Sequence, residues 1–160
     1  MVKQKELRIK SQPAKLVEVE HFVEEISDRF HLNDSYFANI QLALSEAVSN
    51  AIIHGNASDE SKFVRVIFSP TEKGLLFKVL DEGNGFRFEE SKDPQKMLEE
   101  ELHGGRGLLL IHMLSDEVSF SDEGRVIEIL IKVSGIDQDT MEQRVNAMQN
   151  YVDDVPTKKK

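Results

Sequence analysis

The sequence contains no cysteine and no tryptophan, and only four of its 160 residues are proline. Without cysteine, the chain can form neither a disulfide nor a thiolate metal site. No apolar run is long enough to cross a membrane, and residues 1–6 lack the apolar segment of a signal peptide. We therefore expect a cytoplasmic protein that does not associate with membranes.

Positive charge is also scarce. The 20 Lys and Arg residues are outnumbered by 29 Asp and Glu residues, which gives a net charge of −9. General nucleic-acid binding needs a basic surface, so we expect no direct nucleic-acid partner. Hydrophobic residues make up 39% of the chain and charged residues 31%, which is typical of a globular protein. The chain is long enough for one domain with a substantial core.

The stretch 40–55 predicts one long helix, with Gly55 as its C-terminal stop. Its apolar positions recur every three or four residues and form one stripe. That stripe consists of Phe37, Ile40, Leu44, Ala47 and Ala51. Beside it, Glu46, Asn50 and His54 also lie four residues apart and form a polar ladder. Border residues of this kind are often simply solvated, and the helix alone does not decide between the two interpretations.

The remaining periodic segments predict alternating helices and strands. Residues 6–10 predict a strand, and Pro13 opens a helix. The buried stripe of that helix consists of Leu16, Val19, Phe22, Val23, Ile26 and Phe30. Residues 33–35 supply an N-cap for the next helix. Strands are expected at 63–68, 75–81, 117–120 and 126–133, with the first two paired as a hairpin and the last two joined by a turn at 122–124.

One carboxylate ends a strand on its apolar side. Alternation along 75–81 places Asp81 on the same face as Leu75, Phe77 and Val79. A carboxylate in that position needs a hydrogen-bond donor to offset its burial. Gly83 and Gly85 follow at once and allow another molecule to approach the backbone closely. Taken alone, this Asp-x-Gly-x-Gly pattern favours a plain turn over a ligand site.

The segment 86–103 is acidic and weakly patterned, with a short helix expected around 95–102. A segment of this length inside a compact domain is typical of a mobile lid. Three glycines in the run 103–107 then open the apolar stretch 108–114. Glycines at the start of a helix create an anion site from free backbone N–H groups and the helix dipole. The dinucleotide fingerprint differs, because it directly follows a strand.

We expect a domain over residues 1–135 and a helical extension with a basic tail over 136–160. In the extension, Met141, Val145, Met148 and Val152 form a short apolar stripe. Docking of this stripe on its own domain is favoured over self-association, because two heptads make a marginal coiled coil. The final lysines are expected to be disordered.

In this order, the motifs resemble those of the GHKL ATPase superfamily. That superfamily includes gyrase-type ATPases, heat-shock chaperones, histidine kinases and mismatch-repair ATPases. Within it, the chain looks most like bacterial anti-sigma factors that are also serine-protein kinases. The resemblance covers about residues 6–133 and is most specific at Ser45-Glu46-Ala47 to Asn50-Ala51. It implies a two-layer α/β (α+β) sandwich, in which a mixed, mainly antiparallel sheet carries helices on one face, as in the histidine-kinase-like ATPase fold.

The resemblance also implies roles for the helix and strand residues. Asn50 matches a magnesium-ligating asparagine, and Mg²⁺ accepts one amide oxygen beside waters and phosphates. Glu46 matches a general base that takes a proton from a substrate serine or orients water. Asp81 matches the aspartate that accepts a hydrogen bond from the adenine amino group. His54, which follows the helix motif, is counted among the nucleotide-binding residues.

The glycines would complete the nucleotide site in this comparison. Gly83 and Gly85 would let the chain pass close to ATP. Backbone N–H groups of Gly104, Gly105 and Gly107 would lie on the phosphates. From its position among these glycines, we expect Arg106 to reach the β- or γ-phosphate.

The chain departs from the family pattern in its last strand pair. Members often carry a threonine near the adenine, whereas 124–128 contains neither Thr nor Ser, so a water-mediated adenine contact is expected to be missing. The resemblance implies an ATP- and Mg²⁺-dependent homodimeric kinase that binds a sigma factor and phosphorylates a small antagonist (anti-anti-sigma) protein. Two alternatives stay open: a nucleotide-dependent binding module without phosphotransfer, and a slow ATPase.

Overall fold

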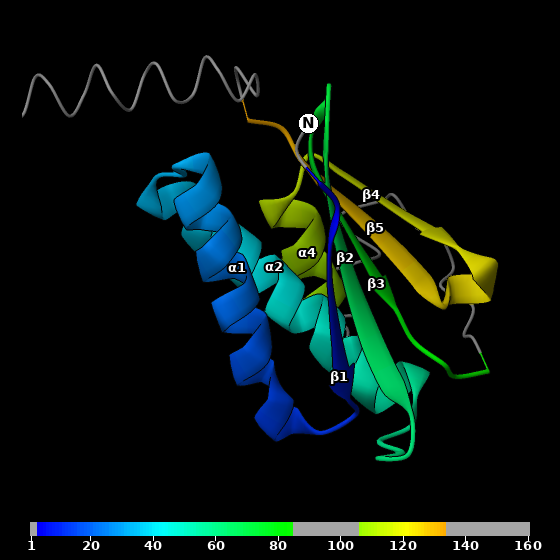
Figure 1. The fold of residues 1–160 in the computed structure, drawn as a ribbon. Helices are drawn as coiled ribbons and strands as arrows, with labels where there is room; N and C mark the ends of the chain where they lie inside the picture. The colour runs from blue at the N-terminus through cyan, green and yellow to red at the C-terminus, as the bar shows by residue number, and fades with distance from the viewer. Residues whose placement is uncertain (1–2, 85–105, 134–160) are drawn as a thin grey trace, which may run out of the picture.

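The computed structural model describes residues 3–84 and 106–133, and within them one sheet is covered by helices on one face (Figure 1). The strands are β1 (Lys5–Lys10), β2 (Phe63–Thr71), β3 (Gly74–Leu80), β4 (Glu117–Ser121) and β5 (Val126–Ile131). The helices are α1 (Leu16–Phe30), α2 (Asp34–Asn50) and α4 (Arg106–Leu114). This two-layer architecture confirms the predicted fold class.

The sheet has the strand order β1-β2-β3-β5-β4, and each of these pairings is antiparallel. The expected parallel component is therefore wrong for the five described strands. The hairpin β2–β3 confirms the predicted pairing, although β2 runs three residues further than expected, to Thr71. The last strand ends two residues earlier than expected, at Ile131.

Several predictions fall outside the described residues. They concern the lid at 86–103 with its short helix, Gly85, Gly104, Gly105, the side chain of Arg106, and the extension at 136–160. The domain boundary at residue 135 lies there as well. These stay predictions.

The core lies between the helices and the inner face of the sheet. The expected stripe of α1 is buried from Val19 to Phe30, with Leu16 partly buried at its edge. Phe30 meets the sheet edge-on, with its ring centroid 5.4 Å from that of Phe68, and Phe68 in turn lies 5.2 Å from Phe77. Aromatic pairs at these separations add to the stabilisation from burial.

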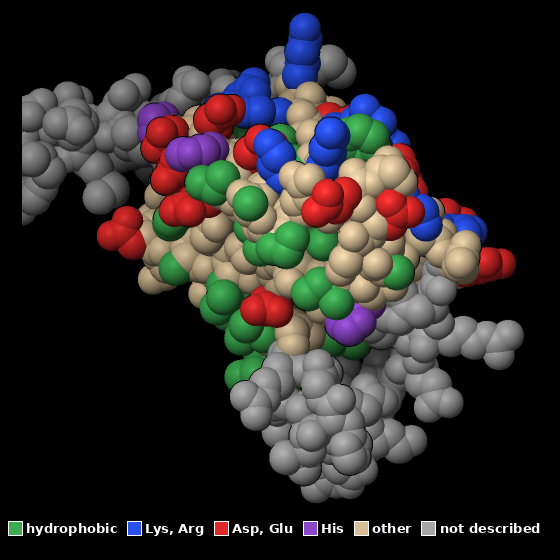
Figure 2. Space-filling model, turned by 90° about the horizontal axis from the view of Figure 1, so that it is seen from below, with side chains coloured by type: hydrophobic (Ala, Val, Ile, Leu, Met, Phe, Trp, Pro, Cys, Tyr) green, Lys and Arg blue, Asp and Glu red, His purple; other side chains and the backbone are tan. Residues whose placement is uncertain are grey.

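The exposed surface mixes apolar and charged groups. Figure 2 shows hydrophobic side chains lying singly or in small groups between charged and polar atoms on the lower face of the molecule. The large exposed hydrophobic residues of the described chain are Val17, Leu42, Ile53 and Met113. Scattered residues of this kind are normal on a folded protein and identify no binding surface by themselves.

The central helix begins as predicted and ends differently. The Asn33 side chain caps α2 by accepting a hydrogen bond of 2.9 Å from the backbone N–H of Tyr36. The stripe along α2 is buried at Ile40, Leu44 and Ala47. Instead of continuing as an α-helix to Gly55, the chain widens into a π-helical turn, η2 (Ala51–Gly55). π-Turns of this kind are frequent at functional sites.

Asn56 joins three segments directly after this turn. Its fully buried amide donates to Ser11 Oγ at 2.7 Å and to the Phe63 carbonyl at 2.9 Å. Its amide oxygen accepts a bond of 2.7 Å from the backbone N–H of Glu82. One side chain therefore ties the end of β1, the start of β2 and the loop after β3 to the end of α2.

Asn56→Ala should lower the free energy of unfolding by about 2–4 kcal/mol, because it leaves three polar groups without their partner in or near the core. The measurement is urea unfolding followed by circular dichroism. Asn39→Ala is the matched control, since Asn39 is exposed on α2. Equal stability of the two variants would show that the buried amide does not hold these segments together.

Candidate functional site

A pocket opens where α2, the start of α4 and the inner face of the sheet meet. It is lined by Ala47, Asn50, Ala51, Val79, Asp81, Leu108, Phe120, Gly124, Arg125 and Ile127. Most of these side chains are apolar, and only a few polar groups interrupt the wall. An apolar lining with a few polar groups is typical of a small-molecule site.

Asp81 lies at one end of this pocket, on the inner side of the sheet as predicted. Its Oδ1 accepts a hydrogen bond of 2.8 Å from the backbone N–H of Gly83. Its own N–H donates to the Arg125 carbonyl at 3.0 Å, so the backbone is held on the side of β5. Within the described residues, Oδ2 has no hydrogen-bond partner.

Burial raises the pKa of Asp81 above that of an ordinary aspartate. The hydrogen bond from Gly83 opposes this rise, and the positive charges of Arg125 and Lys62 oppose it further. Desolvation therefore destabilises the charged form of this carboxyl group, and a hydrogen-bond donor on a ligand would stabilise it.

Two glycines make room for Asp81. A Cβ on Gly55 would overlap the Asp81 carboxylate, and a Cβ on Gly83 would overlap the Gly55 carbonyl. The π-turn η2 and the loop after β3 are therefore packed backbone against backbone. Gly55 ends the helical segment, as the sequence predicted, and its lack of a side chain also positions the carboxylate.

Glu46 and Asn50 lie together at the start of α4. A Cβ on Gly107 would lie 2.6 Å from Glu46 Oε2 and 3.3 Å from Asn50 Nδ2. The first turn of α4 therefore packs against both side chains, while Asn50 also lines the pocket with Asp81. The free N–H groups of a helix N-terminus favour anions, so this end of the site suits a phosphate.

The structure brings Glu46, Asn50, Asp81, Gly83 and Gly107 to one site. His54 is exposed on η2 and is not among the residues that line the pocket. His54 therefore does not join Asn50 in the pocket lining. Its nucleotide-binding role stays a prediction, as do the roles of the predicted site residues that are not described.

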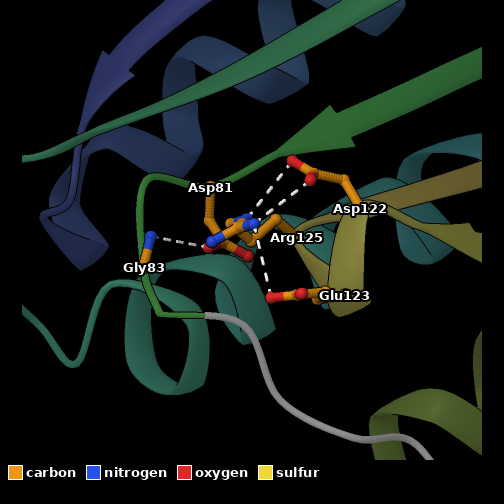
Figure 3. Close-up of polar contacts among 5 residues, drawn as sticks. All are labelled: Asp81, Gly83, Asp122, Glu123 and Arg125. Atoms are coloured by element: carbon orange, nitrogen blue, oxygen red, sulfur yellow. Dashed lines mark hydrogen bonds and ion pairs between the residues drawn. The ribbon is translucent and has the colours of Figure 1, made fainter.

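Sequence reasoning missed Arg125, which lies beside Asp81 (Figure 3). Its guanidinium forms a fork with the Asp122 carboxylate, with Nε–Oδ2 at 3.2 Å and Nη2–Oδ1 at 3.1 Å. Nη2 also lies 3.6 Å from Glu123 Oε2. The run Asp-Glu-Gly-Arg signals a turn, and the resemblance places residues 124–128 near the adenine, but nothing in the run singles out Arg125 as a site residue.

Fold and site together define a nucleotide-binding ATPase domain. The sequence pattern of the family described as the histidine kinase-like ATPase domain matches residues 9–131. The chain belongs to this family, and the family assignment implies ATP binding.

The chain is a distant homologue of serine-protein kinases and anti-sigma factors. It is 26% identical over 144 residues to the serine-protein kinase RsbW of Bacillus subtilis (strain 168), covering 84% of this chain and 90% of that protein. It is 35% identical over 97 residues to the anti-sigma F factor of Clostridium perfringens (strain SM101 / Type A), covering 59% and 69%.

A solved structure has the same fold. The crystal structure of the RsbU and RsbW domains of Rv1364c from Mycobacterium tuberculosis aligns with a TM-score of 0.60 and 18% identity. The alignment covers 82% of this chain and 32% of that longer chain. In the described residues, no helix has both the length and the apolar character that a membrane crossing requires.

Asp81→Asn should weaken ATP binding without lowering the thermal stability of the protein. ATP affinity should fall roughly 10- to 100-fold, because a hydrogen bond to a charged acceptor contributes about 1.5–3 kcal/mol. The melting temperature should stay equal or rise, since the variant no longer buries a charge. Calorimetric titration and thermal unfolding measure the two effects. Unchanged ATP affinity would contradict the assignment of the pocket.

ATP binding should also weaken as the pH falls, because protonated Asp81 cannot accept at both oxygens. Its raised pKa places this loss at a higher pH than the 3.8 of an ordinary aspartate. The sign follows from the shift: ligand binding favours the carboxylate, and acid removes it. Titrations at several pH values should show this dependence in the wild type and a smaller one in Asp81→Asn, which also controls for protonation of ATP.

Proposed function

We propose that this protein is an ATP-dependent serine/threonine-protein kinase that acts as an anti-sigma factor. In this proposal it holds a sigma factor and phosphorylates a small antagonist protein on a serine or threonine. Because the phosphorylated antagonist binds poorly, the kinase is left free to bind sigma; the switch therefore depends on a difference in affinity between two states. The protein would act in the cytoplasm as a homodimer.

The arrangement of Glu46 carries this proposal. Its carboxylate lies against the first turn of α4, beside Asn50 and at the end of the site that suits phosphate. A carboxylate there can accept the proton of a hydroxyl nucleophile as that hydroxyl attacks a phosphoryl group. Asp81 lies at the other end, so base recognition and proton transfer are assigned to different carboxylates.

The names of the relatives support the choice of acceptor and partner. The Bacillus subtilis relative is a serine-protein kinase, and the Clostridium perfringens relative is an anti-sigma F factor. We extend both descriptions to this chain. A protein substrate is also consistent with a site at the surface, where Glu46 and Asn50 are only partly buried.

Asn50 is the residue that would hold Mg²⁺. In the described residues, no group of three or more His, Asp or Glu side chains could hold a metal ion. Mg²⁺ commonly binds through one or two protein oxygens together with waters and phosphates, and the amide oxygen of Asn50 fits that pattern. The bound ion would neutralise phosphate charge.

Glu46→Gln should reduce phosphorylation of the antagonist at least 100-fold, because a general base typically contributes a factor of 100 to 10,000. ATP affinity should remain within about twofold of the wild type. The assay follows transfer of labelled phosphate to proteins of the source lysate, with mass spectrometry to locate the modified residue. Glu20→Gln is the control, since Glu20 is exposed on α1.

The same assay separates the competing functions. A bound partner with no phosphorylated residue, and no effect of Glu46→Gln, would identify a nucleotide-dependent binding module. Release of phosphate without transfer to protein would identify a slow ATPase. Recovery of a sigma factor together with a phosphorylated small protein would support the partner switch.

Asn50→Ala should weaken ATP binding mainly when Mg²⁺ is present. Titrations with and without Mg²⁺ should therefore give a larger difference for the wild type than for the variant. Asn39→Ala serves again as the exposed control on the same helix. If the affinity of Asn50→Ala still responds to Mg²⁺ as the wild type does, Asn50 is not the ligand.

A further inference from the structure

The turn before β5 has an unusual backbone. Asp122, Glu123 and Gly124 all have positive φ, at 51°, 56° and 86°. Residues other than glycine seldom adopt this conformation, and where they do, the surroundings must hold them. Here the Arg125 guanidinium stabilises the turn, because it forms two hydrogen bonds with the Asp122 carboxylate and an ion pair with Glu123.

This strained turn forms part of the pocket wall. Gly124 and Arg125 line the pocket together with Asp81, and Figure 3 shows the Arg125 guanidinium close to the Asp81 carboxylate. Only 28% of the Arg125 side chain is exposed. The fork therefore holds the guanidinium beside the carboxylate that is assigned to base recognition.

Among the described residues, the hydrogen bonds and ion pairs of Arg125 use Nε and Nη2 only. Within the described chain, Nη1 has no hydrogen-bond acceptor, and no direct ion pair joins Arg125 to Asp81. Asp81 and Arg125 both line the pocket, and among the described residues neither Asp81 Oδ2 nor Arg125 Nη1 has a hydrogen-bond partner. The two groups are close enough to interact through their charges but are not joined.

Adenine has the complementary pattern on its edge. Its N6 amino group donates, and the ring nitrogens on either side of it, N1 and N7, accept. We propose that Arg125 is a base-contacting specificity residue, whose guanidinium donates to the ring nitrogen next to the amino group held by Asp81. This inference rests on the proposal that ATP binds in this pocket with its base at Asp81.

The two carboxylates of the turn have a clear role in this arrangement. Arginine loses considerable rotamer freedom when it is fixed, and the Asp122 fork fixes it before a ligand arrives. Preorganised donors lose less on binding than mobile ones do. Asp122 and Glu123 also keep the positive charge of Arg125 paired, so that the guanidinium remains beside Asp81 without closing the pocket through a direct ion pair.

Arg65 provides a matched control. It forms the same kind of fork, with Nε and Nη2 at 2.6 and 3.2 Å from the Glu6 carboxylate. That pair joins β1 and β2, and Arg65 does not line the pocket. Removing Arg65 breaks a fork of equal chemistry without touching the site.

The test is a double-mutant cycle in which one change is in the protein and the other is in the nucleotide. Calorimetric titration of the full chain measures the binding affinity of each combination. Wild type, Arg125→Ala and Arg65→Ala are each titrated with ATP, 1-deaza-ATP and 7-deaza-ATP. Arg125→Ala should weaken ATP binding about tenfold or more, as expected for a charged hydrogen bond. This penalty should disappear with the one analogue that lacks the contacted nitrogen, and it should persist with the other. Arg65→Ala should bind all three nucleotides as the wild type does.

Two results would overturn the inference: no penalty for Arg125→Ala, or an equal penalty with all three nucleotides, which would mean that Arg125 only shapes the pocket. Asp81→Asn separates this failure from failure of the site. If Asp81→Asn weakens ATP binding and Arg125→Ala does not, only the role of Arg125 is wrong; if neither does, the site itself is wrong. Arg125→Lys keeps the charge but lacks the planar fork, and it undergoes the same cycle if the alanine variant does not fold.

Discussion

The backbone-to-backbone contact between the π-turn at the end of α2 and the loop after β3 is the constraint on which the site depends. At this contact Gly83 lies against the carbonyl of Gly55, and Asn56 Oδ1 accepts a hydrogen bond from the backbone N–H of Glu82. The contact closes the helical layer onto the sheet where β3 ends. It also places Asn50 of α2 in the lining of the same pocket as Asp81.

That contact sets the order of groups along the site. Asp81 lies at the sheet end, Asn50 in the middle, and Glu46 at the start of α4. All three are held by backbone that is itself packed, and rigid elements position functional groups more accurately than loops do. A ligand with an anionic part and an aromatic part that carries a hydrogen-bond donor matches this order, and the family assignment implies that this ligand is ATP.

The site is built at some cost to folding. Asp81 is a partly desolvated carboxylate, and burial raises its pKa. Asp122 and Glu123 have backbone angles that favour glycine. Strained and desolvated groups of this kind cluster where a protein binds or reacts. Here Asp81 lines the pocket, and the strained turn leads directly into two further lining residues, Gly124 and Arg125. The surrounding sheet and the two long helices supply the stability that offsets them.

The sequence by itself determined the type and order of the described helices and strands, the buried stripes of α1 and α2, the inward face of Asp81 and the helix that carries Glu46 and Asn50. Each of these follows from periodicity within one segment, which local geometry alone dictates. It also indicated the family, because the order of the motifs is specific. Tertiary structure decided the antiparallel pairing of the five described strands, the π-turn after α2, the linking role of Asn56 and the place of Arg125 beside Asp81. These features depend on contacts between residues that are distant in the chain, and a local sequence pattern does not specify such contacts.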